Sequence, residues 1–148
     1  MTVGDICTRP AVTAHPDETV AAAARRMRDR HVGDLVVAAD ALARPVGILT
    51  DRDIVVSAVA QSPDKLNVLR VGDIMSRDLL TVRTSEALEE ALKKMRVRGV
   101  RRLPVLSADS RLEGVLALDD ILVTMSEDMR GLVALVAREQ QHEREVRV

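Results

Sequence analysis

The feature that most constrains the fold of this chain is an internal repeat. Val3-Gly4-Asp5-Ile6 recurs as Val71-Gly72-Asp73-Ile74, an offset of 68 residues. The same offset aligns further identical residues, namely Arg9 with Arg77, Thr13 with Thr81, Glu18 with Glu86, Ala23 with Ala91, Met27 with Met95, Val32 with Val100, Leu35 with Leu103 and Val37 with Val105. After one deletion the offset becomes 67, which aligns Gly47 with Gly114, Leu49 with Leu116, Asp53 with Asp120 and Ile54 with Ile121. Identities kept in register over about 55 residues indicate a duplicated unit.

Each unit is expected to fold as βαββα. In the first unit the pattern predicts a helical turn, a strand, a helix, two strands and a helix, at residues 3–7, 11–14, 16–30, 35–38, 46–49 and 51–59. The helix at 16–30 has Pro16 and two acids in its first turn, where they suit the free N–H groups and the helix dipole. Its apolar residues recur at helical spacing on one face. Residues 40–44 are expected to form a hairpin loop.

The second unit repeats this plan and is followed by an extension. Ser85 is expected to cap a helix that runs to about Arg98, and residues 103–106 and 112–116 are expected to be strands. A longer helical tract starts at Leu118, and Gly131 is a candidate break in it. The expected division is therefore residues 1–60 for the first repeat, 61–70 for a linker, 71–126 for the second repeat and 127–148 for a helical extension, with a charged end from 138 that is expected to fray.

A single βαββα unit of this size would be marginally stable, because its strands are covered on one side only. Two units packed face to face about a pseudo-two-fold axis remove this weakness. The expected fold class is therefore α/β (α+β), with residues 1–126 forming one module. Such packing leaves two equivalent clefts, one beside each strand-to-helix turn.

Composition excludes several classes of function. The 22 basic and 23 acidic residues nearly cancel, which argues against the basic surface that nucleic-acid binding needs, so no DNA partner is expected. Aromatic residues are absent, which removes the stacking platforms of single-strand binders. No apolar run reaches the roughly 20 residues of a membrane span, and the first residues lack the pattern of a signal peptide. With one cysteine and so no internal disulfide, we expect a cytoplasmic protein.

Three motifs in each unit carry a resemblance to a known family. In the first unit they are Asp5-Ile6, the helix start Pro16-x-Glu18-Thr19-Val20, and Gly47-Ile48-Leu49-Thr50-Asp51-Arg52-Asp53-Ile54. In the second unit they are Asp73-Ile74-Met75, Val100-Arg101-Arg102-Leu103-Pro104-Val105, and Gly114-Val115-Leu116-Ala117-Leu118-Asp119-Asp120-Ile121. On these residues the chain resembles a tandem pair of cystathionine-β-synthase (CBS) domains, the arrangement called a Bateman module. The resemblance covers about residues 1–126 and leaves little of the chain for another domain, so we expect a stand-alone regulatory module. It further implies an adenosine-containing ligand (AMP, ADP, ATP, S-adenosylmethionine or NAD) between the repeats, and pairing into disc-shaped homodimers.

The resemblance places a ligand site in each cleft, and the first cleft has every expected part. Its nucleotide-binding residues would be Ile48, Thr50, Arg52, Asp53, Leu80, Arg101 and Arg102. The carboxylate of Asp53 would accept hydrogen bonds from the ribose hydroxyls, and the hydroxyl of Thr50 would assist at the ribose-phosphate. Arg101 and Arg102 would meet the phosphate oxygens, which arginine can hold with two parallel bonds.

The second cleft is expected to be degenerate. It would be formed by Val12, Gly33, Asp34, Val115, Ala117 and Asp120. Ala117 lacks the hydroxyl, and Asp34 places a negative charge where the first cleft has an arginine. Like charges at this range repel by about 1–4 kcal/mol, so a phosphate should be disfavoured there, which leaves a neutral adenosine or an empty cleft.

Structural interpretations stand beside these functional ones. Thr50-x-x-Asp53 is also a helix cap, Arg101-Arg102 a solvated pair, and Asp119-Asp120 a pair that complements a helix dipole. Cys7, His15 and His31 are not assembled as nucleophile and base, His31 more simply ends a helix, and no metal cluster or glycine-rich phosphate loop stands out. Neither a catalytic residue nor a metal site is therefore predicted.

The sequence is compatible with two functions that belong to different classes. The first is a non-catalytic sensor that needs no cofactor and binds one adenine nucleotide per chain as a regulatory ligand, with a downstream protein as effector. The second is a ligand-independent dimerisation or docking module. Its apolar stripes would be Ile54, Val55 and Ala58 with Ile121, Leu122 and Met125, extended by Leu132, Val133 and Val136. S-adenosylmethionine or NAD in the same cleft remains an alternative ligand.

Overall fold

A computed structural model of the chain describes residues 1–40 and 44–147. The strands form two three-stranded sheets, one per repeat. The first contains β1 (Thr13–Ala14), β2 (Asp34–Val37) and β3 (Gly47–Thr50) in the order β1-β2-β3. The second contains β4 (Val82–Arg83), β5 (Arg102–Leu106) and β6 (Leu112–Ala117) in the equivalent order. In both sheets the first pair of strands is parallel and the second pair antiparallel.

The helices also follow the repeat. The first repeat has α1 (Val3–Ile6), α2 (Val20–Arg30), and α3 (Asp51–Asp53), which continues as the π-helix η1 (Ile54–Val59). The short 3-10 helix η2 (Pro63–Lys65) lies in the segment between the repeats. The second repeat has α4 (Val71–Ile74), α5 (Leu88–Arg98) and α6 (Leu118–Val146). The expected α/β fold of two βαββα units is confirmed, whereas the predicted hairpin loop at 40–44 lies largely outside the described residues.

The two long helices of the repeats start later than their sequence signals suggested. Thr19 is the N-cap of α2 and its hydroxyl accepts from the Ala22 N–H, so Pro16 lies before the helix rather than in its first turn. The cap of α5 is Ala87, so the prediction that Ser85 caps this helix is wrong. The reason is tertiary: Ala87 forms a bridge with Thr2, which keeps the backbone extended up to the helix. His31 ends α2, as predicted, and the structure adds that its backbone is left-handed.

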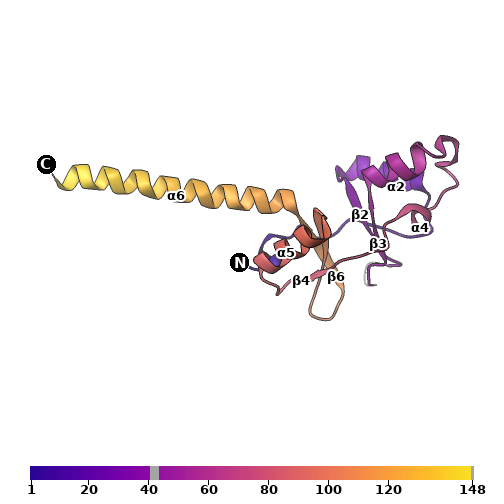
Figure 1. The fold of residues 1–148 in the computed structure, drawn as a ribbon, viewed down its shortest axis with the longest axis horizontal. Helices are drawn as coiled ribbons and strands as arrows, with labels where there is room; N and C mark the ends of the chain where they lie inside the picture. The colour runs from indigo at the N-terminus through magenta and orange to yellow at the C-terminus, as the bar shows by residue number, and fades with distance from the viewer. Residues whose placement is uncertain (41–43, 148) are drawn as a thin grey trace.

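Each repeat receives its first short helix from the other repeat. Val71 and Met75, at the start of the second repeat, belong to the core of the first sheet, and Figure 1 shows α4 beside α2 and β3. Val3 and Cys7, at the start of the chain, belong to the core of the second sheet. Val3 and Val71 are both fully buried. The repeats are thus interlocked by an exchange of their N-terminal segments.

Short bridges fix this exchange. Thr8 pairs with Val115 of β6, and the equivalent Ser76 pairs with Ile48 of β3. The backbones approach closely at both crossings, where a glycine faces the incoming chain. A Cβ built on Gly47 would lie 2.6 Å from the Ser76 carbonyl oxygen, and one on Gly114 would overlap the Thr8 carbonyl oxygen. Gly47 and Gly114, which are equivalent in the repeat, therefore permit the close approach of the exchanged segments.

α6 leaves the second repeat as one continuous helix of 29 residues. The candidate break at Gly131 is not present, because a single glycine costs a helix only about 1 kcal/mol and its neighbours favour helix. Figure 1 shows that α6 projects away from both repeats as an arm. Within residues 1–40 and 44–147 no helix is long and apolar enough to cross a membrane.

Candidate functional site

Two repeat-equivalent residues meet between the repeats. Asp34 and Arg102 are one repeat offset apart in the sequence, and Arg102 Nε lies 2.8 Å from Asp34 Oδ1. An operation that exchanges the repeats also exchanges these two residues, so the pseudo-two-fold axis passes beside this ion pair. Asp34 begins β2 and Arg102 begins β5, so the pair connects the strands that border the two clefts.

The ion pair sits in a poorly solvated position. The Asp34 side chain is 13% exposed and that of Arg102 is 32% exposed. Burial raises the pKa of Asp34 above its ordinary value, Arg102 opposes that rise, and the nearby Asp51 and Asp120 add to it. Arg102 therefore compensates a carboxylate that water reaches only in part. The expected repulsion between Asp34 and a phosphate in the second cleft is therefore weakened by Arg102, whose contact with Asp34 the sequence alone did not show.

In the first cleft, Thr50 and Asp53 hold each other. The Thr50 hydroxyl accepts from the Asp53 N–H at 3.1 Å, and Asp53 Oδ2 accepts from the Thr50 N–H at 2.9 Å. This capping box is the structural interpretation of the motif, and it is present. One such bond leaves most of the lone pairs of the carboxylate able to accept further hydrogen bonds. The cap therefore fixes Asp53 at the turn without using up its capacity to accept from a ligand.

The other residues proposed for the first cleft each contact a different part of the protein. Ile48 pairs with Val36 in the sheet, and Leu80 packs at the edge of the second core. Arg101 Nη2 lies 3.4 Å from Asp119 Oδ1, and both side chains are 70% exposed. Arg52 is exposed on α3. Arg102 forms its ion pair with Asp34, and Asp34 lies opposite Thr50 in the first sheet. Of Arg101 and Arg102, therefore, only Arg102 has a contact with the first repeat among those described.

A small cavity lies at the second cleft. It has a volume of about 130 Å³, and its lining residues are Thr8, Pro10, Ala11, Val12, Val32, Asp34, Val115, Ala117 and Asp120. Five of the six residues proposed for this cleft thus surround one cavity. The sixth, Gly33, lies instead beside Asp51 and Arg102: a Cβ built on it would be 3.2 Å from Asp51 Oδ2 and 3.5 Å from Arg102 Nη2.

Two residues that contribute to the clefts were missed by sequence reasoning. The Thr8 hydroxyl donates to Asp120 Oδ2 at 3.2 Å, so the second cleft has a hydroxyl although Ala117 has none. The repeat offset could have found it, since Thr8 is equivalent to Ser76 and both are hydroxyl residues. Asp51 was missed because only the fold brings it near Gly33, whose carbonyl accepts from the Asp51 N–H at 3.0 Å.

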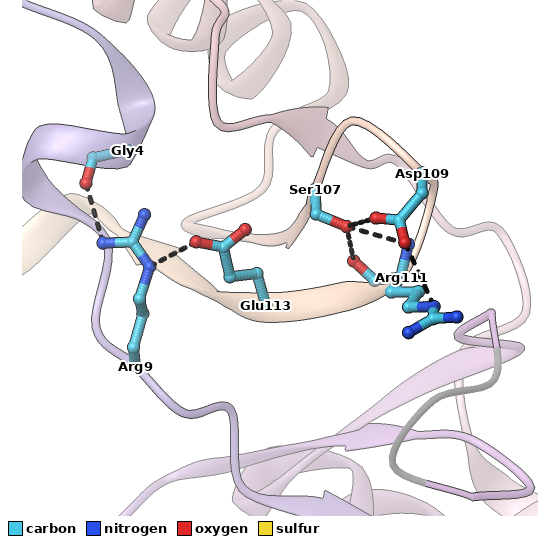
Figure 2. A network of polar contacts seen from close by, with 6 residues as sticks. All are labelled: Gly4, Arg9, Ser107, Asp109, Arg111 and Glu113. Atoms are coloured by element: carbon cyan, nitrogen blue, oxygen red, sulfur yellow. Dashed lines mark hydrogen bonds and ion pairs between the residues drawn. The ribbon is translucent and has the colours of Figure 1, made fainter.

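Arg9 holds together two segments that border the cavity at the second cleft. Its Nε lies 2.7 Å from Glu113 Oε1 of β6, and its Nη1 donates to the Gly4 carbonyl at 2.8 Å, as Figure 2 shows. The equivalent Arg77 makes the same contact with the Gly72 carbonyl. Position 46, which is equivalent to Glu113, is a valine, so the ion pair belongs to the second cleft alone. Thr8 and Pro10, on either side of Arg9, are thereby held against the cavity.

The residues weighed for catalysis each have a structural role. Cys7 packs in the second core, the His15 ring accepts from the Asp17 N–H, and His31 is a C-cap. Asp119 and Asp120 lie in the first turn of α6. Across the part of the chain that the structure describes, no three His, Cys, Asp or Glu side chains are grouped so that they could hold a metal ion.

Comparison with known proteins points to one family. The family model for the CBS domain matches residues 3–59 and 71–127. The CBS domain-containing protein YhcV of Bacillus subtilis is 33% identical over 130 residues, which span 87% of this chain and 89% of that protein. Hypoxic response protein 1 of Mycobacterium tuberculosis is 34% identical over 120 residues, which span 81% of this chain and 82% of that protein.

Solved structures share the fold. Hypoxic Response Protein I, with two coordinated zinc ions, superposes with a TM-score of 0.72 at 33% identity, over 82% of this chain and 97% of that one. The CBS domain pair of protein MJ0100, in complex with 5′-methylthioadenosine and S-adenosyl-L-methionine, gives a TM-score of 0.75 at 26% identity, over 86% and 98% of the two chains.

Proposed function

Since the chain belongs to the CBS domain family, we propose that it is a regulatory module that binds an adenosine-containing ligand between its two repeats. The observation that carries the proposal is the equivalent placement of Asp53 and Asp120 in the first turns of the helices that follow β3 and β6. A carboxylate fixed at such a turn can accept from both hydroxyls of a ribose. The MJ0100 domain pair, which binds two adenosine compounds, supports the ligand class.

For a phosphate-bearing nucleotide we place the site in the first cleft. Asp53 would hold the ribose, and Arg52, Arg101 and Arg102 would supply the positive charge for the phosphates. The cavity at the second cleft, at about 130 Å³, is smaller than the roughly 300 Å³ or more that is usual for ligand pockets, so it would hold at most a small part of a ligand. In this proposal AMP, ADP and ATP are preferred, and S-adenosylmethionine and NAD are the alternatives.

Arg102 makes the two clefts interdependent. A phosphate that recruits Arg102 competes with Asp34 for the same guanidinium group. If the arginine moves, Asp34 remains as a poorly solvated carboxylate at the edge of the second cavity, which carries an energetic cost. Nucleotide binding in the first cleft would therefore alter the second, and this change would be the signal that an effector protein reads. The role is non-catalytic, and we place it in the cytoplasm.

The test is titration calorimetry with AMP, ADP, ATP, S-adenosylmethionine, NAD and adenosine. Dye-based melting is a second readout, because a chain without aromatic residues has no useful intrinsic fluorescence. The matched variants are Asp53→Asn and Asp120→Asn. Each replaces one carboxylate oxygen with an amide NH₂ group, at positions that are equivalent in the repeat. We expect Asp53→Asn to weaken AMP binding at least tenfold and Asp120→Asn to weaken it less than about threefold.

Two results would contradict the proposal. Absence of binding by all these compounds below millimolar concentration would remove the adenosine ligand. A larger loss for Asp120→Asn than for Asp53→Asn would move the site to the other cleft.

A third variant tests the competition for Arg102. Asp34→Asn removes the charge that holds the arginine, so we expect phosphate-bearing ligands to bind about three- to tenfold more tightly. Adenosine, which has no phosphate, serves as the control and should bind equally well to both proteins. Unchanged AMP affinity would show that Arg102 does not contact the phosphate.

A further inference from the structure

The arm formed by α6 has an apolar stripe that no residue of 1–40 or 44–147 buries. The helix packs against β6 and α1, and Ile121 in its first turn is its one buried residue. Its 29 residues make it about 43 Å long, and its residues from 122 to 146 are exposed except for the half-buried Thr124. Figure 1 shows the helix projecting away from the two sheets. The stretch beyond residue 127 also lies outside the match to the CBS domain model.

The stripe has the spacing of a helix that pairs with another helix. It consists of Leu122, Met125, Met129, Leu132 and Val136, which recur at alternating intervals of three and four residues. These side chains are between 53% and 63% exposed. A helix in water with such a stripe gains most of its stability by packing that stripe against a partner.

The surface area of the chain indicates how much a partner should cover. The structure exposes 9532 Å², whereas a compact monomer of 16.2 kDa is expected to expose roughly 7,500 Å². The excess of about 2,000 Å² exceeds the roughly 800 Å² that each partner buries in a standard interface.

Charge distribution selects a second copy of the arm in the antiparallel direction. Residues 118–129 contain four acids and no base, whereas residues 130–147 contain four arginines and three glutamates. Parallel pairing would stack the acidic halves and set Glu139 and Glu143 against their own copies. Antiparallel pairing places the acidic half beside the basic half and also opposes the helix dipoles.

The antiparallel register leaves the stripe apolar throughout. With Met125 opposite Met129 of the partner subunit, Leu122 meets Leu132 of the partner subunit and Leu118 meets Val136 of the partner subunit. We propose that α6 is a dimerisation arm, whose stripe from Leu122 to Val136 pairs antiparallel with the same stripe of a second copy. The inference does not depend on ligand binding and is tested without ligand.

The first experiment measures the mass of the full chain in solution by light scattering and sedimentation. The variant is Leu132→Glu, and the matched control is Ala134→Glu, which places the same charge on the same exposed helix but off the stripe. We expect the wild-type chain and Ala134→Glu to be dimers. Leu132→Glu should raise the dimer dissociation constant by roughly 100-fold or more, because two leucines lose their apolar contacts.

A monomeric wild-type chain overturns the proposal. So does a Leu132→Glu chain that dimerises as tightly as the Ala134→Glu control, because both residues are exposed in the single chain.

The second experiment tests direction by disulfide formation under mild oxidation. A mixture of Leu122→Cys and Leu132→Cys chains should form a mixed disulfide, and Leu132→Cys alone should not form one with itself. The wild-type chain, whose Cys7 is buried, is the control. Efficient self-linking of Leu132→Cys would establish the parallel direction and contradict the proposed pairing.

Discussion

Positions 34 and 102 carry opposite charges although they are equivalent in the repeat. An exact duplication would place two like charges at the pseudo-two-fold axis, where they would repel each other. Here Asp34 and Arg102 form an ion pair across that axis instead. Because the two repeats differ at this one position, they are joined by an ion pair, and their clefts differ in charge.

This ion pair should matter more to stability than its exposed neighbour. Arg102→Ala leaves Asp34 largely buried without a partner, so we expect a loss of about 2–3 kcal/mol in the free energy of unfolding at neutral pH. Arg101→Ala is the control, because its exposed contact with Asp119 should contribute less than about 0.5 kcal/mol. Urea unfolding measures both. Equal losses would show that Arg102 has no special role.

The cost of Arg102→Ala should also depend on pH. The pKa of Asp34 is raised in the folded protein by burial, against the lowering effect of Arg102. Between the unfolded and the folded pKa, only the folded state keeps this proton, so the contribution of Asp34 to stability falls as pH rises through that window. Removing Arg102 raises the folded pKa further and widens the window. Urea unfolding at several pH values should therefore show a smaller loss near pH 4 than near pH 7, and a constant loss would contradict this account.

At the scale of the elements, α2 and α5 are fastened by equivalent ion pairs. Arg26 binds Glu18 with two bonds of 2.6 Å, and Lys94 lies 2.6 Å from Glu86 one repeat later. The hydrogen bond from Arg26 lowers the pKa of Glu18. Burial acts to raise the pKa of Glu86, but the bonds from Lys94 and from the Arg83 backbone outweigh it and lower that pKa. Each glutamate thereby binds the segment directly before its helix to the helix itself.

These pairs should make stability sensitive to acid. A lowered folded pKa stabilises the protein above the unfolded value of 4.5, and this stability is lost as pH falls through the folded pKa. The double variant Glu18→Gln with Glu86→Gln should lose about 2 kcal/mol at pH 7 and little in acid. Thermal melting between neutral and acidic pH measures this. A variant whose acid sensitivity equals that of the wild-type chain would show that other carboxylates cause it.

The glycines differ in what a methyl group would meet. Gly47→Ala and Gly114→Ala would each push a methyl group into the backbone of an exchanged segment. We expect each to cost about 1–3 kcal/mol, because a backbone must shift. Gly131→Ala meets open space on α6 and should add up to about 1 kcal/mol. Thermal melting compares the three, and a loss for Gly131→Ala would mean that an unseen contact requires the glycine.

For the molecule as a whole, the sequence predicted the repeated βαββα plan and the strands, because alternating and helical patterns are local. It did not predict the exchange of α1 and α4, since Val3-Gly4-Asp5-Ile6 and its copy are identical and could cover either core. The Asp34–Arg102 pair and the Thr8 hydroxyl were missed because both contacts join distant parts of the chain. The predicted cap at Ser85 was wrong because the pairing of Ala87 with Thr2 outweighs the local capping preference. The candidate break at Gly131 was wrong because helix-favouring neighbours outweigh the low helix propensity of one glycine.

The exchange should make the two repeats unfold together. Val3→Ala removes methyl groups from the second core, and Val71→Ala removes them from the first, at a cost of about 2 kcal/mol each. Because each core contains a piece of the other repeat, both variants should show one transition with a lower midpoint in urea. Two separate transitions would indicate that the repeats unfold independently.

The interlocking also sets an order for folding during synthesis. The first core draws on a continuous stretch from Ala14 to Met75, so it can close as soon as that stretch has left the ribosome. Val3 and Cys7 are made first, yet their place beside Leu116 does not exist until β6 has been made. The oldest part of the nascent chain is thus among the last to settle, and it completes the half of the protein that is made after it.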